Sequence, residues 1–354
     1  MLRAGEDSMT KRWANRPEPS TWGDWGEDDQ RGRLNLITQA KVKQGLAEAR
    51  EGLSFCLSLP LDYPGGSDLN PRRKPPVLRP TLRGDGPNFN AVARVDETGP
   101  TDVFCDDLAI LHLQYSTQWD ALSHVGSHFD ADGDGVAEKV YYNGFRAGVD
   151  IVGPEGLDGA GVGEGSTSHA GKLGIENMAA SSVQGRAVMI DLHAHFGDAH
   201  TLVDYAMLSE VMEKDGVVVE EGDMVCFHTG FAEKVLGAGR QPTKALLHGT
   251  GASLDGRDPA LLDWITRSGA AVLAADNYAV EAFPGRDGPD SCCAMLPLHE
   301  HCLFKMGIHL GELWHLTPLA TWLREHGRNR FLLTAPPLRL PGAVGSPVTP
   351  IATV

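Results

Sequence analysis

The sequence predicts a single α/β domain, and two observations lead to this fold class. Segments with helical periodicity alternate with short apolar runs of the kind that form buried strands, and several of these runs end directly in polar residues. The length of 354 residues fits one large domain, because neither an internal repeat nor a clean linker divides the chain. We expect an N-terminal arm over residues 1–20 and the domain over residues 21–354.

The first third of the chain predicts one helix, one flap and one strand. Thr38 is a suitable N-cap for a helix that continues to residue 49. Residues 60–90 are rich in Pro, Gly and Arg and follow neither hydrophobic period, so we expect a long loop or flap there. Its four arginines would either clamp an anionic group or be solvated. Residues 107–118 are apolar at first and then alternate with polar residues, which predicts a strand.

The rest of the chain continues the alternation of helix and strand. Asp258 and Pro259 are typical of a helix start, and Gly269 is expected to end that helix. Further helices are expected over residues 201–216 and 298–306. Buried strands are expected over residues 187–192, 224–227, 270–275, 308–316 and 330–334, followed by a Pro-rich tail.

The composition excludes several classes of function. Lys and Arg number 31 against 47 Asp and Glu, and the net charge of −16 disfavours nucleic acid and anionic membranes as partners. No apolar run approaches the roughly 20 residues of a membrane span, and the N-terminus lacks the apolar segment of a secretory signal. The six cysteines form no C-x-x-C pair, which argues against a disulfide scaffold or a zinc ribbon. We therefore expect a cytoplasmic protein that acts on a small molecule.

Metal-capable and acid/base side chains are densest between residues 112 and 134. Residues two apart on an extended strand share a face, so Gln114, Gln118, Asp120 and His124 would point into one cavity. A carboxylate there supplies charge and lone pairs for a divalent metal, and a histidine can accept a proton from bound water. The alternative is that these polar residues form a solvated strand edge.

The segment around Asp120 resembles a known signature. Residues 116–124 read STQWDALSH, and they are similar to the pattern H-x-G-T-H-x-D-x-P-x-H of the cyclase family of metal-dependent hydrolases. That family includes bacterial kynurenine formamidase and isatin hydrolase. Thr117, Asp120 and His124 stand in register with the pattern. Further similar segments lie at residues 25–29 with 34–35, 142–144, 228–230, 276–277 and 299–312, so the likeness spans most of the chain.

The resemblance implies a fold, a reaction and a set of site residues. The fold would be the swivelling β/β/α fold of that family, and the reaction the hydrolysis of an amide, formamide or lactam C–N bond, as in kynurenine formamidase. Asp120 would bind zinc or manganese and His124 would move the proton, with Glu312 as the late acidic residue of the site. His299 is the best match for the late histidine, although His301 is nearly as well placed. Relatives commonly form dimers or larger assemblies, so we expect a homodimer or homotetramer.

Two departures from the signature bear on the metal. Gln114 and Gln118 occupy the histidine positions of the pattern, and Leu122 replaces its proline. Neutral amide oxygens are weaker zinc ligands than imidazole, so a site made of Gln118, Asp120, His299 and Glu312 should prefer a harder ion such as manganese, if it binds any.

Two other metal sites compete with this interpretation. His124, His128 and Asp130 belong to a run that reads H-x-G-S-H-x-D, which copies the ligand half of the signature ten residues later. Asp130, Asp132, Asp134 and Gly135 begin a calcium loop inside an acidic insertion at residues 126–140, but its twelfth position is Tyr141 rather than Glu. Glu138 would have to substitute, or the insertion is empty.

The ends of other predicted strands supply candidate substrate-binding residues. His228 and Asp276 follow such strands directly, and Phe283 would line an apolar pocket suited to an aryl substrate. Two rival functions stay open. His124, Asp120 and Glu312 could perform metal-free acid/base chemistry, as in a lyase or a ring closure, or the chain could bind a ligand without turnover and hold a structural calcium ion.

Overall fold

A mixed sheet forms the centre of the molecule. The computed structural model describes residues 11–93, 98–163, 165–288 and 293–354. Within these residues the main sheet has nine strands in the order β1-β21-β19-β13-β15-β17-β18-β8-β20. Their bounds in that order are Ser54–Cys56, Ile351–Thr353, Arg330–Thr334, Gln184–Asp191, Met224–His228, Val272–Ala275, His309–Glu312, Gln118–Asp120 and Gly345–Pro347.

The direction of these strands decides where a site can form. Strands β13, β15, β17 and β18 run parallel, so their carboxyl ends meet at one edge of the sheet. Strand β8 lies antiparallel beside β18, and its amino end therefore faces the carboxyl end of β18. Residues at the start of β8 therefore lie beside residues at the end of β18.

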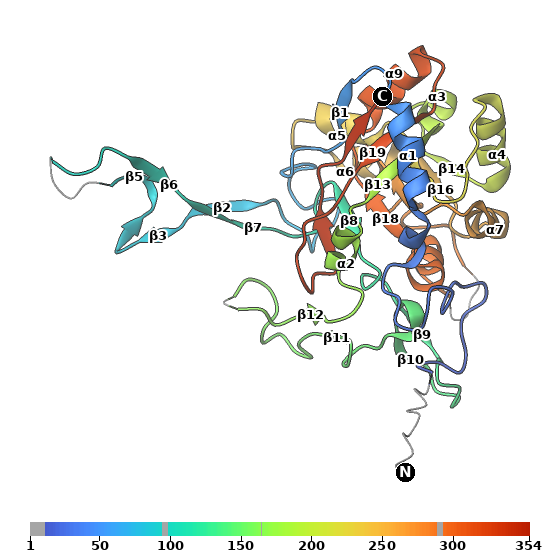
Figure 1. The fold of residues 1–354 in the computed structure, drawn as a ribbon, viewed down its shortest axis with the longest axis horizontal. Helices are drawn as coiled ribbons and strands as arrows, with labels where there is room; N and C mark the ends of the chain where they lie inside the picture. Colours follow the sequence, from blue (N-terminus) through green and yellow to red (C-terminus); the bar gives the residue numbers. More distant parts are fainter. Residues whose placement is uncertain (1–10, 94–97, 164, 289–292) are drawn as a thin grey trace, which may run out of the picture.

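Helices cover both faces of the sheet (Figure 1). The longer ones are α1 (Gln39–Glu48), α4 (Tyr205–Lys214), α7 (Pro259–Ser268) and α9 (Thr317–Glu325). The shorter ones are α2 (Ile175–Ala180), α3 (Leu192–Phe196), α5 (Phe231–Gly237), α6 (Lys244–Gly249), α8 (Pro297–His299), the π-helical turn η3 (Glu300–Met306) and the 3₁₀ turns η1 (Gly32–Leu36) and η2 (Tyr142–Gly144). Among the residues described, no helix is long and apolar enough to cross a membrane.

Two hydrophobic cores lie on opposite faces of the sheet, as the alternation along β13 shows. Val188 and Ile190 point into one core, whereas Ala187 and Met189 point into the other. Trp119 of β8 lies in the second core, where its ring packs edge-on against Trp314 at a centroid distance of 4.9 Å. The predicted α/β fold in one domain is confirmed.

The caps read from the sequence recur in the structure. The side chain of Thr38 accepts a hydrogen bond from the Lys41 amide at the start of α1, and Asp258 accepts one from Ala260 at the start of α7. Gly269 ends α7 in the left-handed conformation at φ +67°. The strands expected near residues 187, 224, 272 and 330 are present as β13, β15, β17 and β19.

Several element boundaries are corrected. The expected strand over residues 107–118 is two short strands in different sheets, β7 (Asp107–Ile110) and β8, joined by a turn. The helix expected over residues 201–216 begins only at Tyr205, because Thr201–Val203 forms β14 beside β16 (Ala252–Leu254) and Asp204 is the N-cap. The expected strand over residues 308–316 is β18 alone, and the Pro-rich tail contributes β20 and β21 to the main sheet.

The expected flap at residues 60–90 is only partly a loop. Residues 77–93 and 98–110 form an extended ribbon that projects from the body (Figure 1). We call these two described segments the β-arm. Its strands are β2 (Val77–Pro80), β3 (Leu82–Arg83), β4 (Gly86–Pro87), β5 (Phe89–Val92), β6 (Val103–Cys105) and β7. Charged residues interrupt the apolar positions of these strands. The alternation of apolar and polar residues that predicts a strand is therefore not visible in the sequence.

A buried ion cluster joins α1 to the sheet. Asp223 is fully buried and accepts hydrogen bonds from Lys41 Nζ at 3.0 Å and from Arg186 Nε at 2.8 Å. Replacing Asp223 by Asn leaves two buried cations with only the half-exposed Glu220 as a carboxylate partner. The free energy of unfolding should therefore fall by about 3 to 5 kcal/mol.

Urea unfolding of the purified variants measures this effect. Asp263→Asn is the matched control, because Asp263 pairs with Arg267 on the exposed face of α7, and it should cost less than about 1 kcal/mol. A loss of stability in Asp223→Asn no larger than in the control would contradict the role given to this cluster.

Candidate active site

The site is built on the pair β8 and β18. Gln118 stands directly opposite Glu312 in the register, and the Gln118 Nε2 amide donates a hydrogen bond to Glu312 Oε2 at 3.1 Å. Asp120 lies two residues after Gln118 and shares its face of the strand, while Trp119 points to the opposite face. Alternation along β8 and its register with β18 therefore bring an amide and two carboxylates together.

A histidine from a separate helix completes the cluster. His299 ends α8, and its Nε2 lies 3.2 Å from Glu312 Oε1 and 3.9 Å from Asp120 Oδ2. One ligand atom each of Asp120, His299 and Glu312 lies within 4.8 Å of the others, and all three residues are buried. His301 lies elsewhere, with its Nε2 2.9 Å from Thr266 Oγ1. Geometry therefore selects His299 over His301.

The cluster contains acceptors without donors. Both carboxylate oxygens of Asp120 and the Oε1 of Gln118 are buried and have no hydrogen-bond partner. Unpaired polar atoms cost free energy when buried, and a buried carboxylate costs most. Burial raises the pKa of Asp120 and the charge of Glu312 adds to this, although His124, His299 and Arg73 act in the opposite direction. A bound divalent cation would satisfy these oxygens, so the residues present fit a metal.

Glu281 orients the imidazole of His299. Glu281 Oε1 lies 2.8 Å from His299 Nδ1 and accepts the His299 backbone amide at 2.9 Å. A proton on Nδ1 leaves the Nε2 lone pair free to face Asp120 and Glu312, as in carboxylate–histidine–metal arrangements. Burial alone would lower the pKa of His299, but the hydrogen bonds to Glu281 and Glu312 raise it to about 10. Without a cation in the site, the imidazole itself would supply the compensating positive charge.

The backbone around these residues adopts unusual conformations. Ala279 and Val280 have φ values of +73° and +60°, directly before Glu281, and Leu313 has +56°, directly after Glu312. Left-handed backbone is uncommon for residues with a Cβ and is a genuine outlier for a β-branched residue. Such strain concentrates at functional sites, where the surrounding structure enforces it. The two segments that present the site carboxylates are therefore held by tertiary contacts.

His124 approaches the cluster from a turn. Strand β8 ends at Asp120, and the His124 backbone amide bonds to the Ala121 carbonyl at 2.9 Å. This turn places His124 Nε2 3.7 Å from Asp120 Oδ1, with 22% of the side chain exposed. Sequence analysis expected Asp120 and His124 to lie close together because both would be on one continuous strand. They do lie close together, but a turn after Asp120, and not a continuous strand, brings His124 there. Gln114 lies before the turn that precedes β8, so its amide is not on the strand that carries Gln118.

Arg73 is a functional candidate that sequence analysis identified only as one of four arginines in the expected flap. Its Nη1 donates a hydrogen bond to the Gln114 carbonyl at 2.6 Å, and its guanidinium lies 5.8 Å from the Tyr278 ring centroid. Among the described residues it forms no ion pair within 4.0 Å. The pKa of Glu312 is lowered, because hydrogen bonding and charge from His299, followed by the charge of Arg73, outweigh burial. Arg73 therefore adds positive charge beside the cluster.

Aromatic residues line the space beside Arg73. Tyr278 contributes to a narrow cleft with Arg73 and Gln114, and also to a small cavity that contains Phe283 and His248. The rings of Tyr278 and Phe283 lie edge to face at 6.2 Å. The position of Phe283 is compatible with the apolar lining expected of it, and Tyr278 was missed by sequence reasoning.

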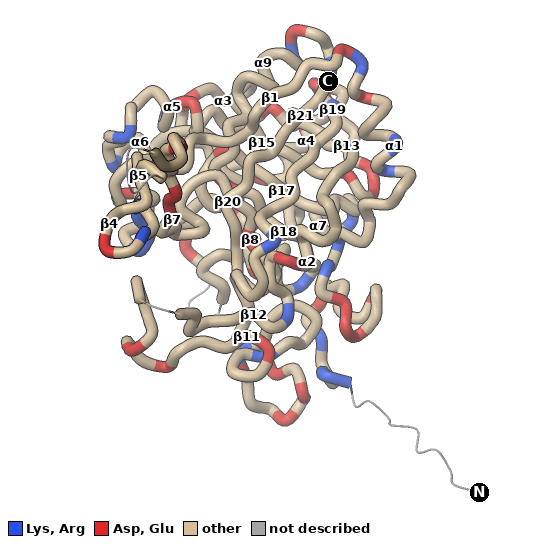
Figure 2. Tube along the Cα trace, turned by 60° about the vertical axis from the view of Figure 1, so that its left-hand side comes forward, with Lys and Arg blue, Asp and Glu red and all other residues tan. Residues whose placement is uncertain are grey.

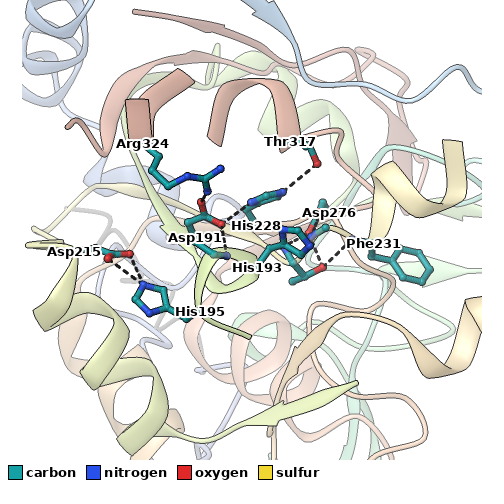
Figure 3. Close-up of polar contacts among 12 residues, drawn as sticks. Asp191, His193, His195, Asp215, His228, Phe231, Asp276, Thr317 and Arg324 are labelled. Carbon is teal, nitrogen blue, oxygen red and sulfur yellow. Dashed lines mark hydrogen bonds and ion pairs between the residues drawn. The ribbon is translucent and has the colours of Figure 1, made fainter. Parts of the chain in front are cut away.

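His228 and Asp276, expected to bind substrate, are instead engaged by the protein. His228 is buried, with Nδ1 2.7 Å from Asp191 Oδ1 and Nε2 3.0 Å from Thr317 Oγ1 (Figure 3). Asp276 accepts hydrogen bonds from the amides of Thr229 and Gly230. No nitrogen of His228 is left for a ligand, so the geometry favours a structural role for both residues at the ends of β15 and β17.

The charge on His228 should make stability depend on pH. Burial lowers the pKa of His228, but its hydrogen bond to Asp191 and the charge of Asp276 outweigh burial and raise it. The pKa of Asp191 is lowered, because the bond from His228 outweighs burial. The stabilisation by His228 is thus complete below the unfolded pKa of about 6.5 and is lost as pH rises through the folded pKa.

The comparison of wild type with His228→Gln isolates this effect. The difference between their free energies of unfolding should be largest below the unfolded pKa of about 6.5 and should shrink as the pH rises through the folded pKa of His228. Urea unfolding at a series of pH values measures it, and a difference that does not change with pH would contradict a charged His228.

The two competing metal sites fare differently. His128 on β9 (Ser127–Phe129) is exposed and lies outside the metal-capable groups found among the described residues, so the shifted signature is not supported. In the acidic insertion, Asp130, Asp132 and Glu138 can approach one another, whereas Asp134 is not part of that group. Arg146 already pairs with Asp132 and with Glu138 at 2.8 Å, which offsets part of the negative charge of the cluster. Calcium binding there stays a prediction.

Comparisons with known proteins agree with the geometry. The family model named Cyclase matches residues 57–282, and no curated protein matches the chain. A crystal structure described as a novel cyclase has 31% sequence identity and a TM-score of 0.71, with 95% of this chain and 97% of that chain covered.

Isatin hydrolases share the fold at lower identity. Isatin hydrolase A from Labrenzia aggregata, bound to benzyl benzoate, has 13% identity and a TM-score of 0.53, with 88% of this chain and 98% of that chain covered. Isatin hydrolase A from Ralstonia solanacearum has 14% identity and a TM-score of 0.52, with 85% and 91% covered. The resemblance seen in the signature residues is confirmed by the family match over more than half of the chain. The chain belongs to the cyclase family.

Proposed function

We propose that this protein is a metal-dependent hydrolase that cleaves the C–N bond of an amide, formamide or lactam, with an activity of the kynurenine formamidase type. The observation that supports this most is the set of unpartnered buried oxygens on Asp120 and Gln118, which faces His299 and Glu312. The fold shared with proteins named isatin hydrolase supports the hydrolytic class.

Asp120, His299 and Glu312 would hold the ion, with Gln118 Oε1 as a further ligand. When bound, a divalent cation supplies polarisation of the substrate carbonyl and a lowered pKa for coordinated water. The donor set contains more oxygen than nitrogen, which favours manganese over zinc. The signature Thr117 ties the start of β8 in place, because its hydroxyl donates to the Leu313 carbonyl and accepts the Leu59 amide at 2.8 Å.

His124 would move the proton. Its Nε2 faces Asp120 from the more exposed side of the cluster, where a water molecule and the substrate carbonyl would meet. In the hydrolysis, the water oxygen bonds to the carbonyl carbon and the C–N bond breaks. His124 takes the water proton and returns it to the leaving nitrogen, as a general base and then a general acid.

Arg73 and the aromatic residues would position the substrate. The guanidinium has free donors beside the cluster and can bind the carbonyl oxygen as negative charge develops on it. Tyr278 and Phe283 offer ring faces to an aryl group on the other side of the scissile bond. The geometry therefore fits aryl formamides, cyclic imides and lactams best.

The test combines metal analysis with a substrate panel. Protein stripped by a chelator and then reloaded with manganese or zinc should regain turnover of at least one compound among aryl formamides, cyclic imides and lactams. Equal turnover by the stripped and the reloaded protein would favour metal-free acid/base chemistry. Binding without turnover in every metal state would favour a ligand-binding protein.

A separate prediction concerns the residue that orients His299. Glu281→Gln keeps the shape of the side chain but removes its charge, so the Nδ1 proton of His299 is held less strongly. Manganese affinity should fall by about 10- to 100-fold. Titration calorimetry on stripped protein measures it. Glu300→Gln is the matched control, because Glu300 bonds to Ser127 and not to His299. An unchanged manganese affinity in Glu281→Gln would contradict the role of Glu281 in orienting His299.

A further inference from the structure

One segment of this acidic chain is strongly basic. Residues 69–84 contain four Arg and one Lys and neither Asp nor Glu, although the whole chain carries a net charge of −16. Figure 2 shows Asp and Glu spread over much of the rest of the molecule. Clustered positive charge attracts anions locally even on a protein whose net charge is negative. The segment includes Arg73, so an anionic molecule that it attracts would arrive beside the candidate site.

The loop holds Arg73 in place before any ligand binds. The Arg73 amide donates a hydrogen bond to the Asn70 carbonyl at 3.0 Å, and Asn70 Oδ1 accepts the Arg72 amide at 3.1 Å. At the other end of the side chain, Arg73 Nη1 donates to the Gln114 carbonyl at 2.6 Å. A guanidinium that is held at both ends loses little conformational freedom when it binds a ligand.

Two nitrogens of the Arg73 guanidinium are free. Among the described residues, Nε and Nη2 have no hydrogen-bond acceptor, and neither atom is sealed from solvent. Their N–H groups are parallel and match the two oxygens of a carboxylate. Nη1 keeps a second N–H for the carbonyl of the scissile bond, so the two interactions use different donors.

The hydroxyl of Tyr278 adds a donor to the same cleft. Tyr278 and Arg73 both line the narrow cleft, where the guanidinium lies 5.8 Å from the Tyr278 ring centroid. Asn70 Nδ2 donates to the Tyr278 oxygen at 3.0 Å, and in the described part of the chain the phenolic proton has no acceptor. Burial, followed by the charge of Glu312, raises the pKa of Tyr278, which keeps this proton on the oxygen. The cleft therefore offers N–H and O–H donors from two side chains.

The cleft has no negative charge of its own to meet these donors. None of the described residues that line it is Asp or Glu. Arg73 lies close enough to Asp120 and Glu312 to interact with their charges, but a bound divalent ion would balance those two carboxylates. The charge of the partly buried Arg73 would then lack a partner, which costs free energy until an anion pairs with it.

We infer that the substrate carries a carboxylate, which Arg73 and Tyr278 bind in this cleft while the scissile C–N bond lies at the cluster of Asp120, His299 and Glu312. A carboxylate is planar, so it can lie in the plane of the guanidinium inside a narrow cleft. The inference rests on the proposed function, because it takes that cluster as the place of C–N bond cleavage. It narrows the substrate from aryl amides in general to acidic ones, such as aryl formamides with a carboxylate on the ring.

The ortho, meta and para formamidobenzoates and their methyl esters test the inference, because acid and ester differ in charge but share the scissile formamide. Release of formate measures C–N cleavage in both. The manganese-loaded wild type should cleave the best acid with a kcat/KM about 10- to 100-fold above that of its ester, as expected for hydrogen bonds to a charged group. Titration calorimetry with the corresponding aminobenzoates and their methyl esters should show the same preference in binding, without turnover.

Variants of the cleft assign the preference to its donors. Arg73→Gln should abolish it, because the amide lacks both the charge and the paired N–H groups. Arg73→Lys keeps the charge and Tyr278→Phe keeps the ring, so each should retain part of it. Arg72→Gln is the matched control, since it removes the same charge from the exposed neighbouring side chain, and its preference should equal that of the wild type. The ratio of acid to ester cancels any loss of turnover that both compounds share.

Thermal melting shows whether each variant stays folded. Equal turnover and equal binding of acid and ester by the wild type would overturn the inference and leave the proposed function standing. A preference that survives Arg73→Gln would place the carboxylate on the metal ion, and one that Arg72→Gln also removes would assign it to the general charge of the segment; either result overturns the inference. Turnover of no compound would count against the proposed function, and calorimetry with the aminobenzoates alone would decide whether Arg73 binds a carboxylate.

Discussion

Replacing Asp120 by Asn should reduce turnover by about 10³-fold or more, a loss of the size caused by removing a group that stabilises charge in the transition state. Asp120 is a fully buried carboxylate that lies 3.7 Å from His124 Nε2 and 3.9 Å from His299 Nε2, and its oxygens have no protein donor. The amide cannot supply the negative charge that a divalent ion and a proton-transfer partner both need. The measurement is steady-state turnover of the manganese-loaded protein on the best compound of the panel.

The same substitution should stabilise the metal-free protein. Burial raises the pKa of Asp120, which means that the folded state holds this carboxylate at a cost. An amide in its place carries no charge to desolvate, so the melting temperature without metal should rise. Asp134→Asn serves as the control, because Asp134 is exposed in the acidic insertion, and it should change neither turnover nor stability. Full turnover by Asp120→Asn would contradict the proposed site.

Replacing His124 by Ala should lower turnover by about 10²- to 10⁴-fold while the metal content stays the same. His124 Nε2 reaches Asp120 only to 3.7 Å and is not among the residues grouped as ligands. Its loss should therefore remove proton transfer and leave the ion bound. Turnover and metal content are measured on the same preparation.

His128→Ala is the matched control for this experiment. His128 belongs to the shifted copy of the signature, and it is exposed on β9. We expect it to turn over substrate like the wild type. If His128→Ala loses activity and metal together, as His124→Ala then also should, the shifted signature, which contains both histidines, is the functional one.

The parts of the fold that sequence predicted depend on local chemistry. Thr38 and Asp258 bond to nearby amides, Gly269 adopts a conformation that favours glycine, and residues 187–190 of the strand expected over 187–192 are all apolar. Each of these features acts within a few residues. The expected boundaries failed where the partner is distant, as for β14, whose neighbour is β16 some fifty residues later in the chain.

The candidate site shows the same limit. Asp120, His124, His299 and Glu312 were identified from the residues and the family pattern, and the structure places them together. Glu281 was missed, because it reaches His299 only through the left-handed backbone at Ala279 and Val280. Gly256 is also needed there, since a Cβ at that position would lie 2.1 Å from Glu281 Oε2. No periodicity or motif in the sequence indicates that Glu281 lies so close to His299 and Gly256.

Manganese titration followed by electron paramagnetic resonance tests the central claim most directly, because it observes the ion without relying on any substrate. The account predicts one bound manganese per wild-type chain and none at the same concentration in Asp120→Asn or His299→Gln. Equal manganese binding by the wild type and by both variants would show that the ion, if it acts at all, lies somewhere other than between β8 and β18.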